Sequence, residues 1–373
     1  MNRLRALAPF ALFAVALVGG QLGLRLLQME YCLTQLTMSL YYGIVVLGLC
    51  LLMGYAGQVS LGHGAFFAIG GYTSAVLTTS DFSRFKAAAW AEMLHQMHVF
   101  VGRQDVFGNP VMTVSPWGAF AVAMLVTLLI ACLIGYPALR LKGHYLAMAT
   151  LGFGLIVYKI VLGTAIFGAA DGIHGVPEWP LLPGLTVSGR TAARVQNYYI
   201  AAGLLLLLLW LLRNLVRSRV GRALQAIHDR ETAANAMGIH TAAYKLQTFV
   251  VSALMAALAG VFLTHYTAGI GPSEASAFKS VRYVALAAAG GMANLWGVAA
   301  VSIGLNYLSL RGLFGTYDNA VFGAILILIV SLAPQGPLKP LGQWVGRLAR
   351  SRSPAVPGHQ AENDAGERVP IRA

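Results

Sequence analysis

Charged residues are scarce in this sequence of 373 residues, and they are unevenly placed. Only 10% of the residues are Asp, Glu, Lys or Arg, against about 25% in soluble proteins. Long stretches carry no charge at all, namely 31–80, 106–139, 195–212 and 283–310. Apolar windows of about 20 residues without charge predict transmembrane helices. The sequence is therefore expected to form an all-α, polytopic membrane bundle. A soluble protein with large buried helices fits poorly, and the continuous apolar runs do not alternate as in a membrane β-barrel.

Acidic residues and cysteines are also few. The sequence has 13 Asp and Glu but 26 Lys and Arg, which gives a net charge of +13. In a soluble protein this excess would suggest nucleic acid as a partner, but here the basic residues flank the apolar spans, as positive-inside topology requires. The three cysteines are odd in number, lie in apolar stretches and lack metal-ligand spacing, which indicates packing and neither a disulfide nor a metal site; they are Cys32, Cys50 and Cys132.

Motifs of catalysis and nucleotide binding are missing. The sequence has no Gly-x-x-x-x-Gly-Lys-Ser/Thr phosphate loop, no His-Glu-x-x-His and no Gly-x-Ser-x-Gly. We expect no enzyme activity and no bound cofactor. A transporter of this kind would need a separate ATP-binding subunit. An ion-driven carrier would instead place acidic residues within its spans, where they are almost absent, and a membrane scaffold is the third alternative.

The spacing of apolar and polar segments predicts eight to ten spans in a permease domain at 1–338. The first span is uncleaved, and the spans lie at about 7–27, 37–54, 118–139, 145–167, 198–212, 246–268, 283–310 and 320–332. Basic residues place both termini inside, which demands an even number of crossings. If the glycine-rich stretch after Gly54 is a further crossing, a break at Gly290–Gly297 that divides 283–310 into two helices fits this count better than one tilted helix. Residues 339–373 are expected to form a basic and then disordered cytoplasmic tail.

A polar, basic stretch at 213–245 interrupts the spans. It holds six basic residues and two acids, and such inserts are typical of cytoplasmic loops. Its alanine-rich middle predicts a short amphipathic helix, which Gly238 ends. Glu231, near the start of that helix, can meet a basic residue of a partner. The alternative is an ordinary amphipathic helix that lies at the lipid interface.

A glycine-rich stretch follows the second span, with six glycines between Gly54 and Gly71. Glycine and polar residues at membrane depth indicate either close helix packing or broken backbone that lines a cavity. In the second case, polar side chains of this stretch and of a later span would line a translocation pathway: Gln58, Ser60, His63 and Asn306. In the first case, His63 finds its hydrogen-bond partner inside the bundle. The sequence leaves both interpretations open.

Several motifs follow one another in the order found in a known family. The chain resembles the branched-chain amino acid permeases of ATP-binding-cassette (ABC) importers, specifically the LivM type, over roughly 47–308. The stretch Glu231–Gly238 looks like the glutamate-alanine-alanine-glycine loop of importer permeases, which docks into the ATPase. The other matching segments are Gly54–Gly70, Pro137–Gly143, Thr150–Gly154, Gly221–Ile227, Ala236–Ile239, Tyr244–Leu246 and Ala259–Gly260.

The resemblance implies the fold and the partners of an ABC importer permease. It implies a second permease subunit, two cytoplasmic ATP-binding subunits, a periplasmic solute-binding protein and a multi-pass location in the inner membrane, surrounded by lipid. It also assigns ATPase docking to Arg222, Glu231, Ala233, Ala234 and Gly238. Arg282 departs from the acidic residue usual near that position, so the cargo stays open between branched-chain amino acids and urea or short amides.

Overall fold

The structure is a computed structural model, and it describes residues 2–83, 100–104, 110–138, 144–312 and 317–332. The expected tail at 339–373 lies outside the described residues. The helices are α1 (Asn2–Leu26), α2 (Cys32–Cys50), α3 (His63–Thr79), α5 (Pro116–Ala138), α6 (His144–Gly163), α7 (Arg194–Arg217), α8 (Arg219–Asp229), α9 (Glu231–Ala236), α10 (Thr241–Thr267), α11 (Ala277–Ala289), α12 (Leu295–Leu310) and α13 (Asp318–Leu332), with a π-helical turn, η1 (Leu51–Tyr55), after α2.

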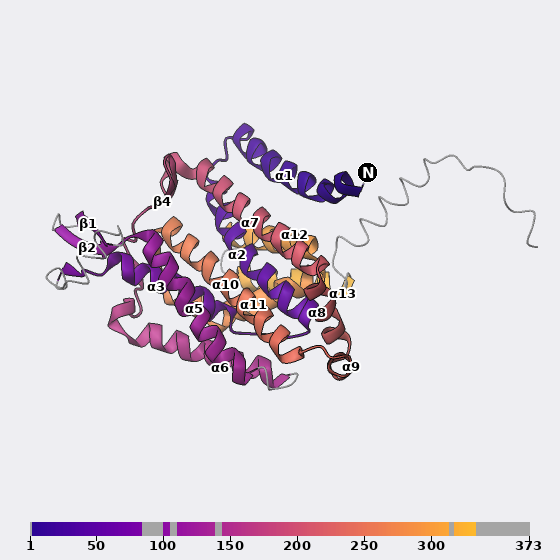
Figure 1. The fold of residues 1–373 in the computed structure, drawn as a ribbon. Helices are drawn as coiled ribbons and strands as arrows, with labels where there is room; N and C mark the ends of the chain where they lie inside the picture. The colour runs from indigo at the N-terminus through magenta and orange to yellow at the C-terminus, as the bar shows by residue number, and fades with distance from the viewer. Residues whose placement is uncertain (1, 84–99, 105–109, 139–143, 313–316, 333–373) are drawn as a thin grey trace, which may run out of the picture.

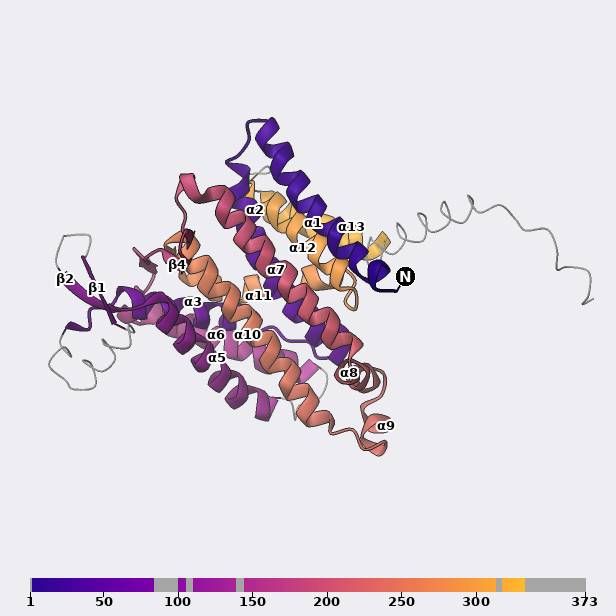
Figure 2. The same cartoon turned by 45° about the horizontal axis from the view of Figure 1, so that its top comes forward.

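Short strands and 3-10 turns connect the helices. The strands β1 (Phe100–Gln104) and β2 (Pro110–Val114) form an antiparallel pair between α3 and α5. Between α6 and α7, β4 (Trp179–Leu182) pairs with β5 (Leu185–Val187), and β3 (Ile173–His174) pairs with the distant β6 (Gly269–Ile270). The 3-10 turns are η3 (Ala165–Phe167), η4 (Thr191–Ala193) and η5 (Pro272–Ala275). These elements lie at the end of the bundle away from α8 and α9 (Figures 1 and 2).

The length and apolar character of the helices confirm a polytopic membrane protein. Within the described residues, six helices are long and apolar enough to cross a membrane, and they lie at Pro9–Leu26, Cys32–Tyr55, Pro116–Ala138, Tyr145–Gly163, Thr191–Arg217 and Thr241–Thr267. Shorter apolar helices cover Leu295–Leu310 and Ala320–Ile329. Together with α3 and α11, these make ten helices of 13 residues or more in the described part of the chain.

The core of the bundle is built around α2. From Leu40 to Met53 its side chains are almost all buried, and α7, α10, α11 and α12 pack around it (Figure 1). The neighbouring pair α3 and α10 packs so closely that side chains are excluded at the contact. A Cβ on Gly260 would lie 2.1 Å from the carbonyl oxygen of Phe67, and one on Gly70 would lie 2.4 Å from that of Ala257. Small residues permit this approach, as helix packing in membranes generally requires.

The predicted break in the last third of the chain is confirmed. α11 ends at Ala289 and α12 begins at Leu295, with Gly291 in the turn at a φ of +86°. The sequence placed the first of these helices too late, at Tyr283. It begins at Ala277, because the Ser276 hydroxyl accepts a hydrogen bond from the Lys279 amide (3.3 Å) and caps the helix.

Candidate functional site

The basic stretch at 213–245 forms two short helices at one end of the bundle. α8 begins at Arg219, where the Ser218 hydroxyl caps it by accepting from the Val220 amide at 3.1 Å. It buries Gly221, Leu224 and Ile227 on one face and exposes Arg222 on the other. A short second helix, α9, follows after Arg230. We call these two helices together the α8–α9 element; Figure 2 shows it protruding below α7 and α10.

The second helix presents a small, mostly exposed surface. Ala234 is buried against the chain, whereas Ala233 is exposed and Met237 is 84% exposed. Gly238 ends the helix with a φ of +83°, a left-handed conformation that glycine adopts without steric cost. The predicted loop therefore has an exposed face, with room for a partner against Ala233 and Met237.

Within this chain, Glu231 is held by the next helix. Its carboxylate forms a salt bridge with Lys245 of α10 (2.6 Å), and the Thr241 hydroxyl donates to it at 3.4 Å. Thr241 also donates to the Asn235 side chain at 3.0 Å. These contacts fix α9 to the first turn of α10. A contact between Glu231 and a basic residue of a partner stays a prediction, and the structure adds an intrachain role for the same carboxylate.

The α8–α9 element lies directly beside the glycine-rich stretch. Gly57 adopts a φ of +67°, and a Cβ at that position would lie 3.0 Å from Nδ1 of His228 in α8. The non-helical segment 57–62 that follows is tied to α6, because the Leu61 amide donates to the Thr150 hydroxyl at 2.9 Å. The backbone is thus non-helical at 57–62, the start of one of the two arrangements that the sequence left open, and this segment begins where α8 touches it.

Further contacts into the bundle start from the π-helical turn η1 and the end of α2. The Tyr55 hydroxyl donates to the carbonyl of Ala293 (2.6 Å), and the Cys50 thiol donates to that of Met292 (3.0 Å). Both acceptors lie in the turn between α11 and α12. The α11–α12 turn can approach this closely because residue 54 is glycine: an added Cβ there would lie 1.7 Å from the Met292 carbonyl oxygen. A continuous set of contacts therefore links α8 to the α11–α12 turn.

The four residues predicted to line a pathway are all buried. The exposed fractions are 4% for Gln58, 1% for Ser60, 0% for His63 and 4% for Asn306. His63 Nε2 shares a hydrogen bond of 2.6 Å with the Ser252 hydroxyl on α10. Among the described residues, Gln58 Oε1, His63 Nδ1 and the Asn306 amide nitrogen find no hydrogen-bond partner. The pathway role stays a prediction, and the Ser252 contact gives His63 the internal partner of the alternative interpretation.

A double-mutant cycle separates the two interpretations of His63. If the main role of His63 is the bond to Ser252, His63→Ala and Ser252→Ala should each lower the free energy of unfolding. The double variant should then lose less free energy than the sum of the two single losses. Hydrogen bonds between membrane helices couple by about 0.6 kcal/mol on average. The cycle is measured by reversible unfolding in mixed detergent micelles.

The matched control for this cycle is Ser74→Ala, because Ser74 bonds His265 and not His63 (2.9 Å). Its effect should add to that of His63→Ala, since the two sites share no partner. Full additivity of His63→Ala with Ser252→Ala would contradict the packing role and favour the pathway role.

One polar cluster was missed in the sequence. The Tyr42 hydroxyl donates to Glu274 Oε1 (3.0 Å), and Lys279 Nζ donates both to that oxygen (2.6 Å) and to the Tyr42 hydroxyl (2.9 Å). Tyr42 lies 232 positions before Glu274, so no local pattern could have joined them. The spacing of Glu274 and Lys279 and the cost of charge at membrane depth were the available signals.

Comparison with known proteins identifies the family. A family model described as the permease component of the branched-chain amino acid transport system matches residues 31–330. The chain belongs to this permease family. The matched range includes η1, the segment 57–62, the α8–α9 element and the Tyr42–Glu274–Lys279 cluster.

Individual relatives of this permease agree with the family match. It is 31% identical over 324 residues to the high-affinity branched-chain amino acid transport system permease protein LivM of Salmonella typhimurium, covering 81% of this chain and 68% of the relative. It is 30% identical to LivM of Escherichia coli, with the same coverage. Identity to LivH of Escherichia coli is 24%, over 81% of this chain and 92% of the relative. No solved structure matches the permease.

Proposed function

We propose that this permease imports branched-chain amino acids across the inner membrane and is driven by two cytoplasmic ATPase subunits. The observation that carries the proposal is the exposed α8–α9 element, which is held against the broken segment 57–62. Its exposed face, with Ala233 and Met237, suits a groove on a partner. The sequence itself has no phosphate loop that could bind ATP.

The contacts within the bundle supply a route for the coupling. Closure of the ATPase subunits would move α8, and His228 would carry that movement to Gly57. From there η1 reaches the α11–α12 turn through Tyr55 and Ala293. Rigid helices joined by two short breaks suit a change between two packed arrangements. A second permease subunit would form the other wall of the pathway.

The charge distribution orients the permease. The α8–α9 element is basic and would face the cytoplasm, while β1–β6 and their loops would face outward, where a periplasmic solute-binding protein delivers the cargo. The relatives named above are described as high-affinity branched-chain amino acid permeases, and this supports leucine, isoleucine or valine as the cargo.

Uptake by proteoliposomes tests this function. The permease, its second permease subunit, the ATPase subunits and the binding protein are reconstituted together, with ATP enclosed on the ATPase side. We expect ATP-dependent uptake of labelled leucine that unlabelled valine inhibits and urea does not. Uptake of urea in place of leucine would contradict the proposed cargo. Uptake driven by an ion gradient without ATP would contradict the proposed ATP-driven mechanism.

A further inference from the structure

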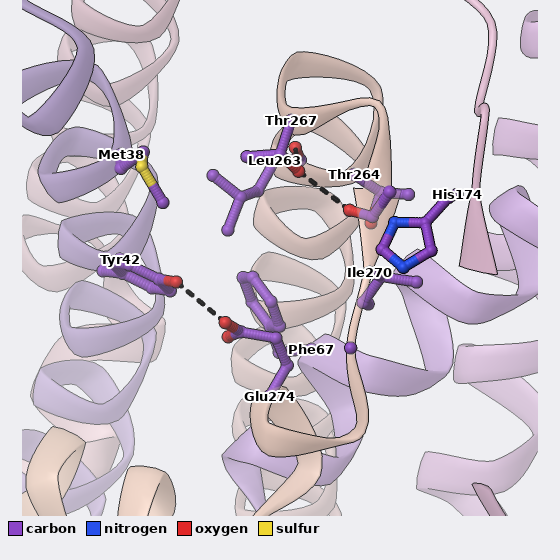
Figure 3. Close-up of a pocket in the computed structure, with 11 residues that line it drawn as sticks. Met38, Tyr42, Phe67, His174, Leu263, Thr264, Thr267, Ile270 and Glu274 are labelled. Carbon is purple, nitrogen blue, oxygen red and sulfur yellow. Dashed lines mark hydrogen bonds between the residues drawn. The ribbon is translucent and has the colours of Figure 1, made fainter. Parts of the chain in front are cut away.

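A pocket of about 270 Å³ opens between α2, α3 and the end of α10 (Figure 3). Its walls include apolar side chains from three elements, namely Met38 of α2, Phe67 of α3 and Leu263 of α10. The pocket is slightly smaller than the roughly 300–1,000 Å³ typical of sites for drug-sized ligands. Its size therefore suits a small aliphatic solute.

An ion pair forms the polar side of the pocket. Glu274 lines it and faces Tyr42, whose hydroxyl donates to Oε1 (Figure 3). Lys279 donates to the same oxygen and also lies 4.3 Å from the centre of the Tyr42 ring. The side chains of Glu274 and Lys279 are only 16% and 23% exposed. Charged side chains with so little exposure are costly within a membrane protein, and such residues often mark solute or ion paths.

The second carboxylate oxygen of Glu274 is left without a partner. Oε1 accepts from both Tyr42 and Lys279, whereas Oε2 is buried and accepts no hydrogen bond from any residue that the structure describes. An unpaired buried acceptor on a charged group is expensive, because the desolvation of that group is not compensated. A ligand that donates a hydrogen bond to Oε2 would recover this energy.

We propose that this pocket binds an aliphatic amino acid during transport, with the Glu274 carboxylate turning so that buried Oε2 accepts a hydrogen bond from the α-ammonium group of the solute. The proposal rests on the function proposed above and names a site for its cargo. The ammonium group supplies the missing donor, and a branched aliphatic side chain fits against Met38, Phe67 and Leu263. Since Glu274 and Lys279 are together neutral, a zwitterion adds no net charge to the site.

The location of the pocket fits a stage early in import. α10 begins beside α9 at Thr241 and ends at Thr267, which lines the pocket at the opposite end of the bundle. In the orientation proposed above that end faces the binding protein. The Glu274 site would therefore receive the solute from outside, before the pathway opens toward the ATPase subunits.

Two variants test the site in the complete reconstituted importer. Glu274→Gln removes the charge while keeping the size of the side chain, and it should raise the KM for leucine uptake at least about tenfold, the loss expected for a hydrogen bond between charged groups. Gly271→Leu keeps the ion pair and adds a bulky side chain to a residue that lines the pocket. Gly271 lines the cavity, and its nearest neighbour to an added Cβ is Ser273 Oγ at 3.8 Å, so the backbone accepts the change. This variant should also raise KM.

The matched control is Glu178→Gln. Glu178 belongs to the same end of the protein and has its own ion pair with Arg190, but it does not line the pocket. Its KM should equal that of the wild type. Assembly of each variant is checked by size-exclusion chromatography. If Glu274→Gln assembles poorly, Glu274→Asp is measured as well, and its KM should lie nearer to that of the wild type because it keeps the carboxylate.

The outcomes separate the site from the function. A raised KM in both Glu274→Gln and Gly271→Leu, with a normal Glu178→Gln, supports the site. Wild-type KM values in both Gly271→Leu and Glu274→Gln would overturn it, while ATP-driven leucine uptake by the wild type would leave the proposed function standing. A wild-type importer that takes up no leucine would overturn both the function and the leucine site.

Discussion

Gly54→Val should leave little folded permease in the membrane. Any Cβ at position 54 would lie 1.7 Å from the Met292 carbonyl oxygen and 2.9 Å from the Ala293 amide nitrogen. Both neighbours are backbone atoms, so no side chain can rotate to make room. Over-packing of a well-filled core costs about 1–3 kcal/mol even where side chains can adjust, and here the whole α11–α12 turn would have to move.

The measurement is thermal stability in detergent, followed by fluorescence-detected size-exclusion chromatography. Gly304→Val is the matched control, because Gly304 lies in α12 and an added Cβ there meets nothing within 4 Å. We expect Gly304→Val to lower the melting temperature far less than Gly54→Val does. Equal stability of the two variants would show that η1 does not pack against the α11–α12 turn as described.

Glu231→Lys should separate ATP hydrolysis from transport. The substitution replaces the salt bridge with Lys245 by two like charges and removes the acceptor for Thr241. α9 would lose the ion pair that ties it to α10 and keep the bond from Thr241 to Asn235, while the rest of the bundle keeps its contacts. This ion pair is partly exposed. Its contribution to stability should therefore lie between the roughly 0–1 kcal/mol of a surface ion pair and the larger free energy lost when a buried pair is broken. We expect leucine uptake to fall at least about tenfold with substantial ATPase activity retained.

The charge-swapped double variant, Glu231→Lys with Lys245→Glu, identifies the partner of Glu231. If the carboxylate acts through Lys245, the swap restores the ion pair and much of the uptake. If it acts on a basic residue of the ATPase, the swap restores nothing. Wild-type uptake by the single variant would remove Glu231 from the coupling.

Hydropathy and charge predicted the helices that face lipid better than those inside the bundle. The charge-free runs around α5 and α7 gave their positions to within a few residues, because lipid demands long, continuously apolar helices. α3 and α11 were harder, since they lie against protein and tolerate polar residues. Lys279 and Arg282 hid the start of α11, and the capping role of Ser276 depends on a backbone geometry that composition alone does not specify.

In the candidate site, too, some features could be predicted from the sequence and others could not. The short helices at 213–245 could be predicted because their residues are consecutive, and a local pattern of basic and small residues can be recognised in the sequence, whereas ATPase docking there stays a prediction. The Tyr42–Glu274–Lys279 cluster could not, since it depends on how α2 meets η5 and α11 across 232 positions. The contact between Gly57 and His228 is of the same kind. Each of these residues looked unremarkable alone, and their packing gives them significance.

Cross-linking from the α8–α9 element tests the central claim most directly. Met237→Cys, in a background in which the exposed Cys132 is replaced by Ala, presents a thiol at a position that is 84% exposed. With a short bifunctional reagent it should cross-link to an ATPase subunit in membranes that contain the whole importer. Leu182→Cys, 61% exposed at the opposite end, should not. Absence of the ATPase cross-link at position 237, or equal cross-linking at position 182, would contradict docking at α8–α9.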